Sequence, residues 1–187
     1  MSHYFGIEEI KVKLVTITAL ALSGEEFCQR YKMGAEGHHH IYNLEDYTKL
    51  TKLIVSNSLI EVAVKIRSLV DALKGQGMPL SLVKGISTYG AGSCADGKLN
   101  KKDFRFICNK IIHAEGFNLD FIGKKSLHKD MVWWSGEVTV SGSYNNKKWE
   151  FFFSVLEWSE QIVNFLKETE AYIDTSQKDS SDLQLHR

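Results

Sequence analysis

Hydrophobic residues recur at helical spacing in two long segments near the start of the chain. In the first, from Ile7 to about Met33, the recurrence predicts a helix that Ser23-Gly24 can bend or split. The second segment, from Leu44 to about Leu73, has Asn43 as its predicted cap. Its predicted buried stripe consists of Leu53, Ile60, Ala63, Ile66, Val70 and Leu73. Its predicted solvent-facing stripe consists of Ser58, Glu61, Lys65 and Ser68.

The middle of the chain predicts a long loop and then a third helix. Residues 74–98 are rich in glycine and contain the single proline, so we expect a loop there. Apolar residues at helical spacing then predict a helix from about Asn100, its cap, to His113 or Ala114. Gly116 is the predicted end of that helix.

The last third of the chain predicts a β-hairpin followed by a helix. Apolar and polar residues alternate on both sides of Asn145-Asn146, a dipeptide suited to a type I′ turn. This turn places Val140 opposite Phe151, Val138 opposite Phe153, Gly142 opposite Trp149 and Gly136 opposite Val155. A helix from about Glu157 to Tyr172 follows, and its predicted inward residues are Trp158, Ile162, Phe165 and Leu166.

Together these elements predict a mainly α fold: a helical bundle with a C-terminal β-hairpin packed on it and a final helix. We expect one domain over residues 1–173, with the hairpin at about 132–156. Residues 174–187 are polar, which predicts a disordered tail.

Composition narrows the functional classes. The 187 residues contain 23 Lys and Arg against 23 Asp and Glu, so the formal net charge is zero. This balance argues against nucleic-acid binding by bulk charge, although a local basic patch stays open. Three widely spaced cysteines give no disulfide framework. The apolar run Leu14–Leu22 is too short to span a membrane, so we expect a cytoplasmic protein.

A polar stripe on the third predicted helix is the strongest candidate for chemistry. Lys101, Arg105, Asn109 and His113 are spaced four apart and share one side of a helix. A cation, an amide and an imidazole in line can bind a phosphate and move a proton. The competing interpretation is a solvated helix face with a histidine placed favourably at the helix C-terminus.

The segment Cys108-Asn109-Lys110-Ile111-Ile112-His113 resembles the signature of the HEPN superfamily. That signature is an Arg, commonly followed by a polar residue such as Asn, with a His at short spacing. The resemblance implies a helical bundle, usually dimeric, and in many members a metal-independent ribonuclease of RNA processing, toxin–antitoxin or antiphage systems. It makes His113 the catalytic histidine and Asn109 the polar position, in a composite site built by two subunits.

The segment departs from the signature at the Arg position, which holds Cys108. A neutral thiol cannot stabilise the charge that develops on a phosphate under attack, as a guanidinium does. Two alternatives follow. Either Arg105 or Arg67 supplies the charge from elsewhere in the fold, or the protein is a relative that does not cleave RNA.

Three other features carry weaker hypotheses. His38, His39 and His40 are adjacent in a polar segment and could bind a metal, although adjacent loop residues rarely converge on one ion. Residues 92–99 are one hydroxyl residue short of a P-loop. Aromatic residues cluster around the hairpin, where we expect one face in the core and Trp133 and Phe152 on the other.

Two function hypotheses therefore stand. The first is a HEPN-like protein of RNA metabolism or defence that acts as a homodimer on RNA, with His113, Asn109 and either Arg105 or Arg67 in its site. The second is a binding or scaffold module without catalysis that contacts a protein partner through the hairpin aromatics. Neither hypothesis requires a metal or another cofactor, and neither involves a membrane.

Overall fold

The computed structural model describes residues 6–31, 44–75, 87–93, 99–125 and 130–185. Within these ranges the fold is mainly helical, with a three-stranded antiparallel sheet and a final helix. The described helices are α1 (Ile7–Arg30), α2 (Leu44–Gly75), α4 (Phe104–Ile112) and α5 (Val155–Leu185).

The described strands form two antiparallel sheets. Strands β1 (Ser87–Ser93) and β2 (Leu99–Asp103) pair with each other as a two-stranded sheet. Strands β3 (Gly116–Lys125), β4 (Asp130–Tyr144) and β5 (Lys147–Ser154) form the larger sheet in the order β3-β4-β5. Consecutive strands are neighbours there, so the larger sheet is a simple meander.

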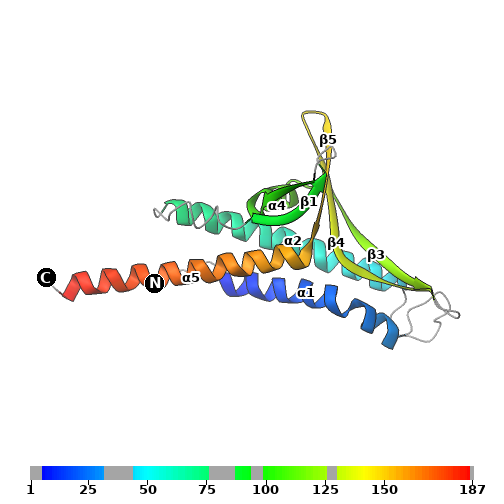
Figure 1. The fold of residues 1–187 in the computed structure, drawn as a ribbon, viewed down its shortest axis with the longest axis horizontal. Coiled ribbons are helices and arrows are strands. Elements are labelled where there is room, and N and C mark those ends of the chain that lie inside the picture. Colours follow the sequence, from blue (N-terminus) through cyan, green and yellow to red (C-terminus); the bar gives the residue numbers. More distant parts are fainter. Residues whose placement is uncertain (1–5, 32–43, 76–86, 94–98, 126–129, 186–187) are drawn as a thin grey trace.

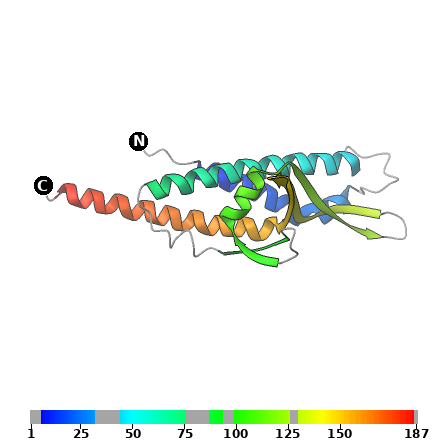
Figure 2. The same cartoon turned by 90° about the horizontal axis from the view of Figure 1, so that it is seen from above.

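The three long helices α1, α2 and α5 run along the length of the molecule, while α4 and the sheets lie against them on one side (Figures 1 and 2). Helix α1 contacts both α2 and α5, and α4 packs on α2. The hairpin of β4 and β5 rises from the helices, so its turn is far from α1 (Figure 1). This arrangement leaves the outer sides of α1 and α2 without a covering element among the described residues.

The hairpin prediction is confirmed in its turn and in most of its register. Asn145 and Asn146 adopt φ values of 50° and 62°, the left-handed values of the predicted type I′ turn. The observed pairs include Val140 with Phe151, Val138 with Phe153 and Gly142 with Trp149. Only the fourth predicted pair fails, because Val155 begins α5 instead of extending β5.

Large aromatic side chains fill the core between the sheet and the helices. The predicted inward residues of the last helix, Trp158, Ile162, Phe165 and Leu166, are all buried. The Phe104 ring of α4 lies 5.0 Å from the Phe165 ring of α5, which holds these helices together. Burying side chains of this size contributes most of the apolar area that stabilises such a fold.

The predicted faces of α2 are partly wrong. Leu53 and Ile60, predicted as core, are 56% and 39% exposed. Ser58, predicted as solvent-facing, is buried at 3% exposure. The reason is that α2 carries apolar residues on two sides, so their spacing alone does not tell which side meets the core.

The third helix begins later than predicted. Residues 99–103 form strand β2, so Asn100 lies in a strand and does not cap a helix, and α4 starts at Phe104. The predicted loop over residues 74–98 contains strand β1. Gly116 begins the unpredicted strand β3 instead of ending a helix. Strands β1 and β2 are short and pair with each other, and local residue spacing does not reveal such a partner.

Two helices are more continuous than the sequence analysis predicts. Helix α1 is not split at Gly24, which is buried in close packing: a Cβ there would lie 3.2 Å from the Tyr47 hydroxyl oxygen and 3.4 Å from Trp133 Cβ. Helix α5 continues through Leu185, across most of the stretch assigned to a polar tail. That stretch contains neither Gly nor Pro to interrupt the helix.

Candidate functional site

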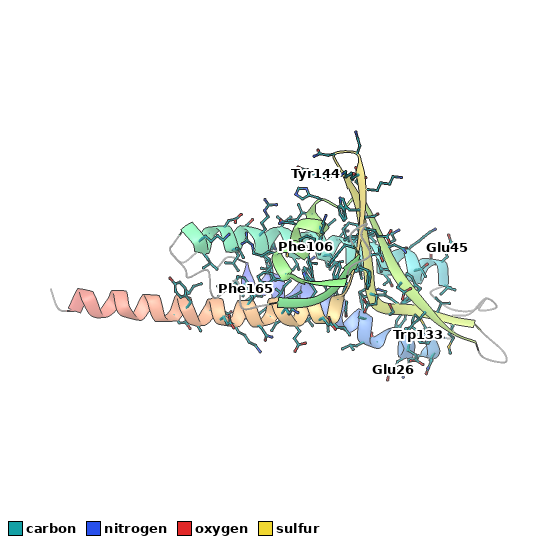
Figure 3. All side chains as sticks on the ribbon, turned by 45° about the horizontal axis from the view of Figure 1, so that its top comes forward. Glu26, Glu45, Phe106, Trp133, Tyr144 and Phe165 are labelled. Atoms are coloured by element: carbon teal, nitrogen blue, oxygen red, sulfur yellow. The ribbon has the colours of Figure 1, made fainter. Side chains whose placement is uncertain are left out.

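The end of α4 and the tip of the hairpin together form a polar and aromatic surface. We call it the α4–hairpin surface and define it by residues of these two elements: Asn109, Lys110, His113, Tyr144, Lys147 and Trp149. Asn109 and His113 are both exposed there. Figure 3 shows Tyr144 near the free end of the hairpin, with Phe106 of α4 below it.

Backbone and side-chain hydrogen bonds attach the end of α4 to strand β4. The Glu115 N–H donates to the Ser141 carbonyl at 2.8 Å. The Glu115 carboxylate in turn accepts from the Ser143 N–H at 3.1 Å and from the Ser143 hydroxyl at 2.5 Å. These bonds hold the helix end and the hairpin tip in one orientation, and they engage the Glu115 carboxylate within the chain.

A cation–π contact joins the two elements across the surface. Lys110 Nζ lies 4.0 Å from the centre of the Trp149 ring and 5.5 Å from that of Phe106. Gly142, opposite Trp149 in the sheet, makes room for this ring: a Cβ there would lie 2.5 Å from Trp149 Cζ2 and 3.0 Å from the His113 carbonyl oxygen. A glycine at position 142 is therefore required, because the Trp149 ring and the backbone just after α4 both approach the β4 backbone closely there.

One face of the β4–β5 hairpin is apolar and buried near the core and becomes polar and exposed toward the tip. Tyr144 and Lys147 are directly paired and lie on the same sheet face as Trp149, because residues two apart on a strand share a face. Tyr144 is 74% exposed, and Lys147 is exposed as well. Lys148 lies on the opposite face with Glu150. The face beside α4 therefore gathers two lysines, an imidazole and two aromatic rings.

The structure does not bring the predicted arginines to His113. Lys101 lies in β2, so the predicted four-residue stripe does not exist on one helix. Arg105 is partly buried and lies about 12 Å from His113 along the helix direction, given 1.5 Å per residue. Arg67 is exposed on α2. Within the described part of the chain, no side-chain hydrogen bond or ion pair is recorded for Arg67, Arg105 or His113.

Cys108, at the Arg position of the resemblance, is buried at 1% exposure in the main core. The helical spacing explains this burial, since Phe104, Ile107 and Ile111 lie on the same side of α4 and are also buried. Asn109 and His113 lie on the exposed side. The residues of the motif segment therefore divide between the core and the solvent.

The perturbed ionisable groups lie outside this surface. Burial raises the pKa of the Glu137 carboxyl, and the nearby Glu157 carboxylate raises it further. Burial also raises the pKa of the Cys28 thiol, which donates to the Val132 carbonyl at 3.3 Å. A raised thiol pKa is typical of an unreactive structural cysteine.

The remaining sequence candidates find little structural support. His38, His39 and His40 and most of residues 92–99 lie outside the described residues. Among the residues that are described, no group of three potential metal ligands converges. Trp133, predicted on the hairpin face away from the core, is partly buried against α1, so only Phe152 of the predicted pair is exposed, at 38%.

Sequence reasoning missed Lys110, Tyr144 and Lys147 as site residues, and it included Trp149 only as one of the clustered hairpin aromatics. Lys110 was inside the motif segment but was not singled out, and the hairpin register alone already puts Tyr144, Lys147 and Trp149 on one face. The missing information was the position of α4, which only the tertiary structure supplies.

Comparisons with family models, curated proteins and solved structures give no match for this chain. In the described residues, no helix is long and apolar enough to cross a membrane.

Proposed function

We propose that the protein is a HEPN-like RNA-binding protein of RNA metabolism or defence, and that it holds single-stranded RNA on the α4–hairpin surface without cleaving it. The observation that carries this proposal is the pairing of Lys110 with Trp149 beside the exposed His113. Lysines that meet phosphates and exposed rings that stack on bases are the usual means of holding single strands.

The composition of the surface favours an unpaired strand. Tyr144 presents an exposed ring, the partly buried Trp149 ring lies under the Lys110 ammonium, and Asn109 and the Asn145-Asn146 turn offer amide donors and acceptors. Bases in an unpaired strand are free to stack on such rings and to hydrogen-bond along their edges. The choice of RNA over DNA rests on the resemblance of the motif segment to the HEPN signature.

Burial of Cys108 supports binding without cleavage. Cleavage that follows the HEPN pattern needs a guanidinium beside the histidine. The position that would carry it faces the core, and Arg105 and Arg67 make no recorded contact with His113 among the described residues. An exposed imidazole without such a charge can still donate a hydrogen bond to a phosphate or a base.

The direct test is fluorescence anisotropy of a labelled, unstructured RNA oligonucleotide titrated with the full chain. We expect binding that weakens with added salt, because lysine contacts to phosphates release counterions. Lys110→Ala and Lys147→Ala are each expected to raise the Kd about three- to tenfold, and Trp149→Ala by a similar factor because Lys110 loses the ring that positions it. The same RNA should stay intact after long incubation.

A matched control distinguishes binding at the α4–hairpin surface from a general attraction between RNA and any exposed lysine. Lys167→Ala removes an exposed lysine from α5, away from the hairpin, and should leave the Kd unchanged. The absence of any RNA binding by wild type, or an equal loss in Lys167→Ala and Lys110→Ala, would refute the proposal. Cleavage of the RNA that His113→Ala abolishes would refute the non-cleaving part and restore the nuclease alternative.

A further inference from the structure

The outer sides of α1 and α2 carry apolar stripes that nothing in the described structure covers. On α1 the stripe positions Val12, Val15, Ala19 and Leu22 follow the alternating three- and four-residue spacing of a helix-packing seam. On α2 the exposed apolar residues share one side of the helix and are interrupted by Asn57. We call these stripes together the α1–α2 face. Its large apolar residues, each between 39% and 69% exposed, are Val12, Val15, Leu22, Leu50, Leu53, Ile54, Ile60 and Val64.

The two stripes lie side by side because α1 and α2 are antiparallel and in fixed register. Ion pairs join Glu9 to Lys65 and Lys13 to Glu61 near one end. Near the other end, Leu20 and Phe27 of α1 line a cavity of about 170 Å³ together with residues of α2 that include Leu50 and Ile54. Neighbouring residues of the two helices therefore have residue numbers that add to about 74, as in Glu9 with Lys65 and Lys13 with Glu61.

The exposed apolar area suits a stable interface. Eight large apolar side chains at these exposures present several hundred Å², of the order of the ~800 Å² that each partner buries in a standard interface. Contiguous patches of that size are uncommon on a monomer unless they bind something. Apolar residues along one side of each of two neighbouring helices are typical of a surface that packs against other helices.

Charges mark the four corners of this face. Glu8 and Glu26 lie at the two ends of the α1 stripe, and Lys49 and Arg67 lie at the two ends of the α2 stripe; all four are exposed. Within the chain, Glu8 also pairs with Lys11 at 3.0 Å and Lys49 with Glu45 at 2.6 Å, and both pairs are solvent-exposed on the Glu8 and Lys49 side. The two end residues of each stripe are 18 residues apart, which is five helical turns or about 27 Å. By the register above, Arg67 is level with Glu8, and Lys49 is level with Glu26. Figure 3 shows Glu26 on the outer side of α1.

We propose that this face binds a second copy of the chain in a four-helix arrangement. The two-fold axis runs parallel to the helices, so that α1 of each copy packs antiparallel on α2 of the other. This operation brings Glu8 of one copy to Arg67 of the other and Glu26 to Lys49, so that unlike charges meet at every corner.

The charges also exclude the alternative packing. A two-fold axis that lies in the plane of the interface but runs perpendicular to the helices would place α1 of one copy on α1 of the other. Glu8 of one copy would then lie opposite Glu26 of the other, and Lys49 opposite Arg67. Like charges would then meet at every corner, which disfavours that packing. The apolar residues of the face therefore favour binding of a second copy, and its four charged residues favour one orientation of that copy.

This interface is separate from the α4–hairpin surface. Helix α1 and helix α4 lie on opposite sides of the molecule (Figure 1). A dimer formed through the α1–α2 face leaves both RNA-binding surfaces open, one on each copy. The inference does not rest on the proposed function, because it uses only the exposure and charge of α1 and α2.

Sedimentation of the full chain over a range of concentrations tests the interface. We expect a dimer of twice the chain mass, with a Kd that Leu53→Asp and Val15→Asp each raise at least tenfold by burying a carboxylate in the seam. Ile122→Asp is the matched control, since Ile122 is 45% exposed on β3, outside the face, and should leave the Kd unchanged. Far-UV circular dichroism checks that every variant is folded.

Charge reversal tests the orientation. Glu26→Lys and Lys49→Glu should each raise the dimer Kd about tenfold, because each alters two symmetry-related corners. The double variant should return most of the affinity. A monomer at all concentrations, or a dimer that Leu53→Asp does not weaken more than Ile122→Asp, would overturn the interface. A double variant as weak as the sum of the single variants would overturn the proposed axis.

Discussion

Cys108 and His113 show how the helical repeat separates residues that are neighbours in sequence. Cys108 lies within the packing side of α4, beside Phe104 and Ile111, whereas His113 lies in solvent. A residue at position 108 is thus selected for its fit to the core. An arginine at position 108 could reach solvent only if the packing of α4 changed.

Cys108→Arg therefore should not create a nuclease. It should lower the free energy of unfolding by about 3–5 kcal/mol, the usual cost of a buried charge without a partner. Cys108→Ala should cost only about 1–2 kcal/mol, as a small cavity. Urea denaturation followed by circular dichroism measures both. A Cys108→Arg variant as stable as wild type would mean that position 108 can reach solvent.

Glu137 provides a pH-dependent test at the same scale. Burial and Glu157 raise the pKa of its carboxyl, so the fold favours the protonated form. The contribution of Glu137 to stability is complete below the ordinary carboxyl pKa and is lost as the pH rises through the raised value. Glu137→Gln, which imitates the protonated form, should raise the Tm by a few degrees at neutral pH.

In acid the difference between Glu137→Gln and wild type should shrink to nothing, because wild-type Glu137 is then protonated too. Thermal unfolding at neutral and acidic pH measures this. Glu160→Gln, at an exposed position on α5, is the control that should change the Tm at neither pH. A Tm gain for Glu137→Gln that is the same at both pH values would contradict the assigned cause.

At the scale of elements, the turn and register of the hairpin could be predicted because their causes are local. Asn145-Asn146 supplies the positive φ angles, and Gly142 opposite Trp149 shows that a large ring needs space. Strand β3 was missed although Phe117, Leu119 and Phe121 alternate along it. This period of two was a usable signal, since Leu119 is buried and Phe117 and Phe121 are partly buried.

Gly142→Ala tests the junction of α4 and the hairpin. The new Cβ would crowd the Trp149 ring and the His113 carbonyl, so we expect a loss of about 1–3 kcal/mol of stability. Displacement of Trp149 should weaken RNA binding as well. Gly75→Ala, at the end of α2, adds a Cβ that meets no described atom of another element within 4 Å and should change neither quantity appreciably. Denaturation and RNA titration of both variants provide the comparison, and equal effects would contradict this packing account.

For the whole molecule, the formal net charge is zero, but two surfaces differ in composition. Lysines and rings gather at the α4–hairpin surface, while apolar stripes with charged corners lie on α1 and α2. The mainly helical fold and the core of α5 could be predicted from periodicity. The two faces of α2 could not, because Leu53 and Leu59 are equally apolar and only the packing of α1, α4 and the sheet decides which is buried.

The central claim, that RNA lies across the end of α4 and the hairpin tip, is tested most directly by ultraviolet crosslinking of bound RNA. Mass spectrometry then identifies the crosslinked peptides. The account predicts crosslinks at Trp149 and Tyr144, both of which should be lost when unlabelled RNA competes. Crosslinks confined to α1 and α2, or none under conditions where RNA is bound, would contradict it.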